Sequence, residues 1–258
     1  MPKAPVGTHP ASEPALRDAA DAAMLRPMDE TPPSGPRAGD IDPGAPPMSS
    51  LELSRELMAA ISRLQGRDVG ATLDRAMIAL GLHRTVEEVL LPCMREVGTR
   101  WSRGLCDAQE EQLATLVVRS WLVQRGREAP PALNERPVVL ACGPLDGHTI
   151  ALETFGVLLS HAQLGCLNLG AQVSPAALAT AVDTTSAQAV VVVSHLARNR
   201  AAAVSALRAV GDSSATLFYA GAAFRTTATR HRVPGRYLGG NLSGAATLVR
   251  TQLLRTTG

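Results

Sequence analysis

The sequence predicts an α/β fold in which a four-helix bundle precedes a five-stranded parallel sheet flanked by helices. In residues 50–128, apolar side chains recur three and four residues apart, which is the spacing of amphipathic helices. From residue 136 onward, short apolar runs rich in β-branched residues alternate with helical segments, as is typical of a buried parallel sheet. Eleven of the 18 prolines lie in the first 50 residues, and they set a separate tail apart from both regions.

Residues 1–48 form this predicted tail. They are rich in Pro, Ala, Asp and Gly, and they contain four basic and seven acidic residues. A run such as Thr31–Pro36 supports neither a helix nor a strand ladder, and the segment has too few apolar residues to offset the entropy of ordering. We therefore expect a disordered tail with a short helix near residues 15–26.

The composition argues against several classes of protein. The formal net charge is +2 and aromatic residues are scarce, whereas nucleic-acid-binding proteins cluster basic charge and stack bases on aromatic rings. The four cysteines include no CxxC pair, so neither a structural zinc site nor a small disulfide framework is expected. The N-terminus has no secretory-signal pattern, and no apolar run approaches the roughly 20 residues of a membrane span. We expect a cytoplasmic protein without a membrane segment.

The bundle is predicted to contain four helices. The first begins at the Ser49–Ser50 cap and carries apolar residues at helical spacing, namely Leu53, Leu57, Ile61 and Leu64. The others follow at residues 69–80, 85–101 and 107–125. Gly81 comes directly after the second helix and is a residue type that favours helix C-termini. Short connections between four such helices predict an up-down bundle over residues 50–128.

The second predicted domain, residues 136–258, follows the proline-containing linker Ala129–Ala132. Its strands are predicted at residues 137–142, 166–170, 189–194, 215–220 and 236–238. Between them lie helix signals such as Ser174 followed by Pro175, a cap and first helical residue. Five strands in about 120 residues fit the flavodoxin-like, or Rossmann-like, order 2-1-3-4-5, in which the loops after strands 1 and 3 flank a ligand crevice.

The loop after strand 1 contains the first residues that could carry chemistry. It has neither the GxGxxG of dinucleotide sites nor the GxxxxGK[ST] of a P-loop. It does contain Asp146, Gly147 and His148 at the carboxyl end of a strand. In a metal site, one imidazole nitrogen coordinates the ion while a carboxylate fixes the proton on the other. The alternative is that His148 caps a helix or is an ordinary buried polar residue.

Two further loops are predicted to meet the first at the same edge of the sheet. Strand 3 leads into Ser194, His195 and Leu196, and strand 4 leads into Gly221, where small residues let a ligand approach the backbone. Each feature alone is also compatible with ordinary packing. His195 and His83 are spare imidazoles, and nothing in the sequence aims either at a ligand.

Together these loops resemble those of a cobalamin-binding domain. That family carries Asp-x-His-x-x-Gly after strand 1, Ser-x-Leu after strand 3 and Gly-Gly after strand 4. In this chain, Ala151 and Ala220 replace two of the glycines. The resemblance implies that His148 is the lower axial ligand of cobalt and that the nucleotide tail of the cofactor enters the crevice beside Ser194. It also implies cofactor contacts from the remaining matched residues, Asp146, Gly147, Leu196 and Gly221.

The bundle extends the resemblance. Its third and fourth helices contain Trp101, nine further residues and then Glu111 and Gln112. This pattern is similar to the cap of CarH-type light-sensing, adenosylcobalamin-dependent regulators, which carry Trp, nine residues and then Glu-His. The resemblance implies that Trp101 shields the upper face of the corrin and that Glu111 and Gln112 hydrogen-bond the adenosyl group. The alternative is that Trp101 is a core residue and Glu111 a solvated one.

The chain departs from the regulators in two ways. The proline-rich tail stands where they have a MerR-type DNA-binding head, so no direct DNA binding is expected. Ser102 stands where a cap His can ligate cobalt after photolysis, so a bis-His state by that route is not expected. Headless relatives such as photocobilins also bind a bilin, and the sequence has no signature that identifies a second chromophore here.

The function expected from this resemblance is that of a light sensor rather than an enzyme. Cleavage of the Co–C bond of adenosylcobalamin would rearrange cap and sheet, and output would pass through a protein partner or a homo-oligomer. The alternatives are a corrinoid carrier of a methyltransferase system, a light-independent cobalamin-responsive antirepressor, and a degenerate protein that binds no corrin.

Overall fold

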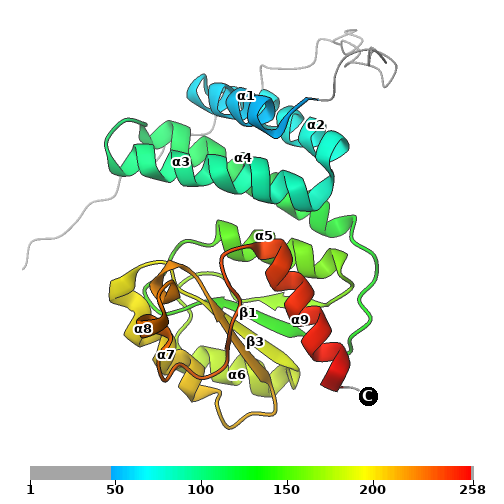
Figure 1. Ribbon diagram of the computed structural model, residues 1–258, viewed down its shortest axis with the longest axis vertical. Helices are drawn as coiled ribbons and strands as arrows, with labels where there is room; N and C mark the ends of the chain where they lie inside the picture. The colour runs from blue at the N-terminus through cyan, green and yellow to red at the C-terminus, as the bar shows by residue number, and fades with distance from the viewer. Residues whose placement is uncertain (1–47, 257–258) are drawn as a thin grey trace, which may run out of the picture. The chain divides into compact units, whose positions relative to one another are not determined.

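The computed structural model describes residues 48–256, and almost the whole predicted tail, with its helix near 15–26, lies outside them. Four stacked helical segments form the cap at the top of Figure 1. The first helix, α1 (Ser50–Ser62), begins with a reciprocal capping box between Ser49 and Glu52. The predicted extension of its apolar face to Leu64 is wrong. The helix has ended by then, and Leu64 has a φ of +54° and is exposed in the turn.

The second helix, α2 (Gly66–Arg84), is interrupted where the sequence predicts its end. Gly81 has a φ of 72° and a ψ of 168°, which are not helical values, and the chain re-enters helix directly afterwards. Only glycine adopts a positive φ without strain from a side chain, so this residue sets the bend.

The predicted third helix consists of two pieces of different pitch. Residues Thr85–Leu90 form a π-helical turn, η1, and Leu91–Ser102 form α3. The reason lies in Pro92, which has no N–H to donate to the carbonyl of Glu88 one turn earlier. That carbonyl accepts a hydrogen bond from the Ser54 hydroxyl of α1 instead, at 3.2 Å.

The fourth helix, α4 (Ala108–Arg127), completes the cap. Its first turn is closed by a capping box between Asp107 and Glu110. Further along, Trp121 is 4% exposed and donates its indole N–H to Asp74 at 2.9 Å. Within residues 48–256, no helix is both long and apolar enough to cross a membrane.

The sheet contains five parallel strands in the order β2-β1-β3-β4-β5, which confirms the predicted flavodoxin-like topology. The strands are β1 (Val138–Cys142), β2 (Cys166–Asn168), β3 (Ala189–Val193), β4 (Thr216–Ala220) and β5 (Arg236–Tyr237). Each matches its predicted run and is shorter by one or two residues. Because β1 lies between β2 and β3, the loops that follow β1 and β3 lie side by side.

Helices cover both faces of the sheet (Figure 1). Alternate residues of β1 point to opposite faces. Val138 and Leu140 pack with α5 (Ile150–His161) and α9 (Leu242–Thr256), whereas Val139 and Ala141 pack with α6 (Pro175–Thr185) and α7 (Arg200–Ala209). The short segments η2 (Ala197–Asn199), η3 (Ala222–Phe224) and α8 (Thr227–Arg230) follow β3 and β4.

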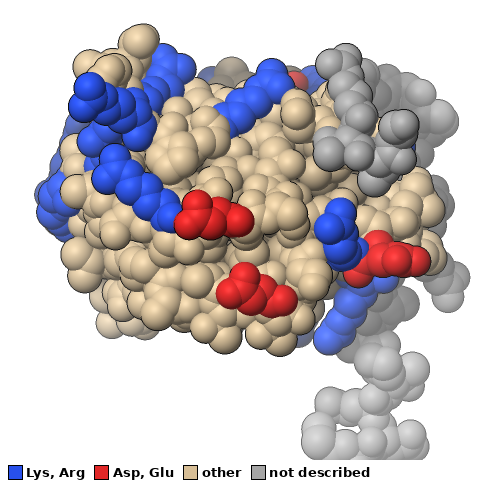
Figure 2. Space-filling view, turned by 90° about the horizontal axis from the view of Figure 1, so that it is seen from below, with Lys and Arg blue, Asp and Glu red and all other residues tan. Residues whose placement is uncertain are grey.

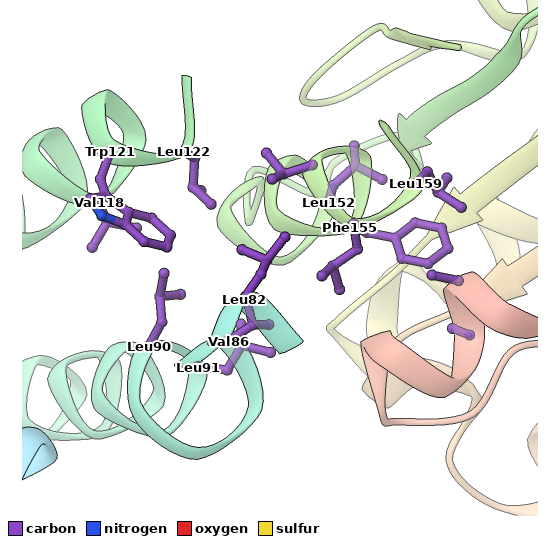
Figure 3. Close-up of a cluster of buried hydrophobic side chains, with 14 of the residues drawn as sticks. Leu82, Val86, Leu90, Leu91, Val118, Trp121, Leu122, Leu152, Phe155 and Leu159 are labelled. Carbon is purple, nitrogen blue, oxygen red and sulfur yellow. The ribbon is translucent and has the colours of Figure 1, made fainter. Parts of the chain in front are cut away.

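The first of these cores continues into the cap. In Figure 3, Leu82 and Val86 lie on the side of the cap that faces Leu152 and Phe155 of α5. All four residues belong to one buried hydrophobic cluster. Polar bonds add to this contact, since Glu87 accepts the backbone N–H of Ser243 at 2.9 Å. Burial at this junction holds the cap over one edge of the sheet.

Charge is distributed unevenly over the surface. Residues 197–236 contain seven arginines and a single acidic residue, Asp212. Figure 2 shows basic side chains gathered at the left of the face seen from below, the side on which Figure 1 places α7 and α8. The net charge of +2 therefore conceals one strongly basic region.

Candidate functional site

A cavity of about 550 Å³ lies between the cap and the carboxyl ends of the central strands. From the cap, α3 and α4 contribute Met94, Val97, Gly98, Glu111, Thr115 and Arg119 to its wall. From the sheet side come, among others, Gly147, His148, His195, Gly221 and Leu238. The cavity thus lies at the strand edge at which the sequence predicts a ligand crevice.

Asp146 is the buried centre of the site. Its side chain is fully buried, and its Oδ1 accepts the backbone N–H of His148 at 3.1 Å and lies 2.9 Å from the Nδ1 of that residue. The Nε2 of His148 has no hydrogen-bond partner among the described residues, and the side chain is 61% exposed. A metal-binding histidine has this arrangement when no ion is bound: one nitrogen is held by a hydrogen bond, and the other is available to the metal. It is not that of a buried structural histidine.

The second oxygen of the same carboxylate holds a second histidine. Asp146 Oδ2 accepts the backbone N–H of His195 at 2.5 Å and lies 3.3 Å from its Nδ1. The centroids of the two imidazole rings are 5.5 Å apart. Burial alone would raise the pKa of Asp146, but the hydrogen bonds from His195 and His148 outweigh it and hold the pKa well below its usual range. The carboxylate is therefore ionised at any physiological pH.

The sequence predicts no role for His195. The only signal was its position, directly after a strand that neighbours the strand before Asp146. Since both imidazoles are bonded to one carboxylate, His195 lies on the same side of the cavity as His148. The other described imidazole noted from sequence, His83, is exposed and lies 3.0 Å from the Ser243 hydroxyl. Among the described residues, no histidine lines the cap side of the cavity.

Gly221 lines the cavity, and Ser194 lies directly behind the wall. The hydroxyl of Ser194 is buried and has no hydrogen-bond partner within residues 48–256. Gly221 has a φ of 102°, and a Cβ at that position would lie 2.1 Å from the carbonyl oxygen of Ser194. The backbones of β3 and β4 therefore approach closely here, next to an unsatisfied hydroxyl. Buried polar groups in native proteins nearly always have a partner, so this hydroxyl is available to bond a ligand atom or a water.

The predicted cap residues are only partly brought together. Glu111 lines the cavity and accepts a hydrogen bond from the Thr115 hydroxyl at 3.0 Å. Gln112 is exposed and is not part of the cavity wall. Trp101 is 57% exposed near the end of α3, so it is not the bundle core residue, a place taken by Trp121.

Trp101 nevertheless shares a helix face with cavity residues. It follows Met94 by seven residues and Gly98 by three, and positions at these spacings lie on one side of a helix. Leu196 is half-buried and, like Trp101, lies outside the cavity wall. The structure therefore gathers Glu111, Gly147, His148 and Gly221 around the cavity, with Asp146 and Ser194 directly behind them.

One contact at the rim of the cavity could not be predicted from the sequence. Arg119 of α4 reaches Glu153 of α5 at 3.1 Å and donates to the Thr149 hydroxyl at 2.6 Å. It joins the cap to the segment that follows His148. A lone arginine on an amphipathic helix does not reveal such a partner, because the partner is 34 residues away in sequence.

Comparison with known proteins is consistent with this geometry. Residues 53–124 match the B12 binding domain family. The HTH-type transcriptional repressor CarH of Myxococcus xanthus is 33% identical over 132 residues, which cover 51% of this chain and 44% of the repressor. The repressor CarA of the same organism is 30% identical over 140 residues, covering 52% of this chain and 46% of CarA. The chain thus spans less than half the length of these curated relatives.

Among solved structures, the monomethylamine corrinoid protein of Methanosarcina barkeri has the same fold. The TM-score is 0.61 at 12% sequence identity, and the alignment covers 79% of this chain and 100% of the corrinoid protein. This confirms the fold class, a helical cap with a Rossmann-like parallel sheet. The match of residues 53–124 to the B12 binding domain family supports cobalamin binding.

The described residues fit a bound corrinoid. In the part of the chain that the structure describes, the Nε2 of His148 and the buried Ser194 hydroxyl have no hydrogen-bond partner. Gly221 leaves the backbone bare at the same strand edge.

Proposed function

We propose that this protein binds adenosylcobalamin between its cap and its sheet and acts as a light sensor. One observation carries the proposal: the cavity contains an imidazole, His148, whose Nδ1 is paired with a buried carboxylate while its Nε2 is free. The match to the B12 binding domain family and the similarity to the repressors CarH and CarA support a regulatory role.

On the sheet side, His148 would hold the cobalt of the cofactor through its Nε2. Asp146 keeps the ring oriented through Nδ1. This contact also makes Nε2 more basic and therefore a stronger ligand for a metal. The Ser194 hydroxyl would bond the nucleotide end of the cofactor, and this contact would satisfy a group that is otherwise orphaned. Gly147, Leu196 and Gly221 complete this side of the proposed site.

On the cap side, the proposal gives Glu111 and Thr115 the polar contacts to the adenosyl group. Gln112 is the next residue of α4, and Trp101 lies one turn beyond Gly98 on α3. An exposed tryptophan on the cavity side of a helix gains from burial, and the upper group of the cofactor would cover it. When bound, adenosylcobalamin supplies a cobalt–carbon bond that visible light cleaves.

The proposed switch follows from where these contacts lie. After illumination, the cap residues would lose the adenosyl group, whereas His148 would keep its place on the sheet. The bound adenosyl group would therefore stabilise the dark arrangement of cap and sheet, and its loss would remove that stabilisation. A two-state switch requires such a difference in affinity between two conformations. The Arg119 contact with Glu153 lies at the rim where the two parts would move. Output would be non-enzymatic, through a protein partner or a second copy of the chain.

The test uses the full-length protein loaded with adenosylcobalamin in the dark. We expect a bound cobalamin spectrum, a change of spectrum and of elution volume after green light, and loss of cobalamin retention in His148→Ala. His83→Ala, which removes an exposed imidazole outside the cavity, is the control and should retain the cofactor. Wild-type protein that retains no cobalamin, or that is unchanged by light, would contradict the proposal.

A second candidate is a corrinoid carrier for methyl transfer. It is favoured by Gln112, which stands where the light-sensing regulators have the histidine of their Glu-His pair. A methylcobalamin-loaded protein that is insensitive to light and active with a methyltransferase would support the carrier. A far-red absorption band after incubation with biliverdin would add a bilin to the light-sensor proposal.

A further inference from the structure

The same loops contain one feature that a cobalamin site does not use, the second imidazole. Asp146, His148 and His195 each offer one ligand atom, and these atoms all lie within 4.8 Å of one another. Two come from the loop after β1 and one from the residue pair after β3. His195 lies beside His148 on one carboxylate, so it cannot ligate the opposite face of a corrin that His148 holds.

We propose that the protein without cobalamin binds a divalent transition-metal ion, such as Zn²⁺, through Asp146, His148 and His195. Two imidazoles and one carboxylate are a ligand set that such ions favour, and an open fourth position for water is common at sites with three protein ligands. The metal-binding part of this inference is independent of the proposed function.

The spacing of the ligand atoms suits this role. The two Nδ1 atoms lie 2.9 and 3.3 Å from the oxygens of Asp146. Around a tetrahedral ion with bonds of about 2.0–2.1 Å, neighbouring ligand atoms are roughly 3.4 Å apart. The two Nδ1 atoms face different oxygens of the carboxylate, and the three ligand atoms lie within 4.8 Å of one another, so both rings would rotate to bring their nitrogens around one ion.

Burial and access also fit. Asp146 is fully buried and is held in place by the backbone N–H groups of His148 and His195, so its carboxylate is fixed before any ion arrives. The side chains of His148 and His195 are 61% and 25% exposed and line the cavity, which offers an entry path and room for a water ligand. The carboxylate supplies a negative charge, and within residues 48–256 no Lys or Arg forms an ion pair with it.

Metal binding and cobalamin binding would exclude each other. Ligation of cobalt through Nε2 needs the Nδ1 of His148 to stay on Asp146, whereas the metal site uses that carboxylate and that nitrogen itself. This second part of the inference rests on the proposed function. A metal-loaded protein would be slow to take up cobalamin until the metal leaves.

The first experiment measures Zn²⁺ binding to the full-length, cobalamin-free protein by calorimetry and by the rise in melting temperature, reversed with EDTA. We expect one ion per chain, and at least about 10-fold weaker binding in His148→Ala and in His195→Ala, because loss of even an outer-sphere partner costs that much. His83→Ala is the matched control and should bind as the wild type does. His195→Gln preserves side-chain volume and hydrogen bonding to Asp146, and circular dichroism checks that each variant folds.

The second experiment measures hydroxocobalamin uptake with and without prior Zn²⁺. We expect the Zn²⁺-loaded wild type to take up hydroxocobalamin more slowly than the Zn²⁺-free wild type. In His195→Gln, prior Zn²⁺ should slow uptake by a smaller factor. Wild-type-like Zn²⁺ affinity in both His195 variants would overturn the metal site and leave the cobalamin proposal untouched. Conversely, Zn²⁺ binding through all three residues in a protein that takes up no cobalamin would refute the proposed function and uphold the metal site.

Discussion

At the residue level, the site is organised by a single carboxylate. Asp146 receives backbone N–H groups from two loops and contacts both imidazoles, so it ties the loop after β1 to the loop after β3. Charge-assisted bonds of this kind are stronger than neutral ones, and several of them converge on a fully buried group. The positions of His148 and His195 therefore depend on a residue that touches no solvent.

Gly221 is the residue whose substitution should disturb the crevice most directly. In Gly221→Ala the new Cβ would collide with the Ser194 carbonyl, and the residue would keep a φ near 102° that strains any side chain. We expect a loss of at least about 1–3 kcal/mol in the free energy of unfolding of the cobalamin-free protein. Urea denaturation followed by circular dichroism measures it.

Gly147→Ala is the matched control, because a Cβ there meets no atom within 4 Å. Its unfolding free energy should change by less than about 1 kcal/mol. If both alanine variants were equally stable, the close approach of β3 and β4 at Ser194 would be wrong.

At the level of elements, α4 depends on its first turn. The capping box of Asp107 and Glu110 closes the end of the helix that carries Glu111 into the cavity. At the other end, Trp121 anchors α4 in the bundle through its bond to Asp74. The helix is thus held at both ends, and the cavity wall lies near the end that faces solvent.

Removing the N-cap residue of α4 should loosen the first turn of the helix, which forms part of the cavity wall. Asp107→Ala leaves the backbone N–H of Glu110 without its acceptor, which costs about 1 kcal/mol of stability. Hydrogen exchange of the amides in residues 108–112 should accelerate, while that of residues 118–122 should not. Gln112→Ala, an exposed change in the same turn, is the control and should leave exchange and stability unaltered. Equal exchange in Asp107→Ala and the wild type would argue against the capping box.

At the level of the whole molecule, cap and sheet share one apolar core. Leu82 of α2 and Leu152 of α5 belong to the same buried cluster, which continues through β1 to α9. A continuous core favours cooperative unfolding, because neither part can lose its contacts without exposing the other. This coupling is also what would let a ligand in the cavity influence the position of the cap.

The two parts are therefore expected to unfold together in urea. Both tryptophans, Trp101 and Trp121, lie in the cap, and both tyrosines, Tyr219 and Tyr237, lie in the sheet. Tryptophan fluorescence and the ¹⁹F signal of incorporated fluorotyrosine should give the same midpoint. A cap signal that changes at lower urea than the tyrosine signal would contradict the shared core.

A substitution at the junction tests the same coupling. Leu152→Ala should lower both midpoints together, at a cost of about 2–5 kcal/mol for a buried leucine. Leu51→Ala removes an exposed leucine of α1 and should have little effect on either.

Particular residues show how far sequence patterns could predict this structure. The strands were predictable because five apolar runs alternate with helices, and five strands in about 120 residues fit the flavodoxin-like order. The π-helical turn before Pro92 was not, because periodicity over 85–101 is the same for both helix types and the compensating donor, Ser54, lies on another helix. The predicted helical position of Leu64 is wrong because apolar spacing continues past Ser62, where the helix ends.

By itself, the sequence determined the order of the elements, the strand edge at which the site lies, and the Asp146–His148 pair, because two residues apart on one turn must be neighbours. Tertiary structure alone decided that His195 shares the same carboxylate, that the Ser194 hydroxyl is buried without a partner, and that Arg119 bridges cap and sheet. The physical reason is that the contacts of His195 and Arg119 join residues 30 or more positions apart, and no local spacing encodes which distant side chains meet when two elements pack together.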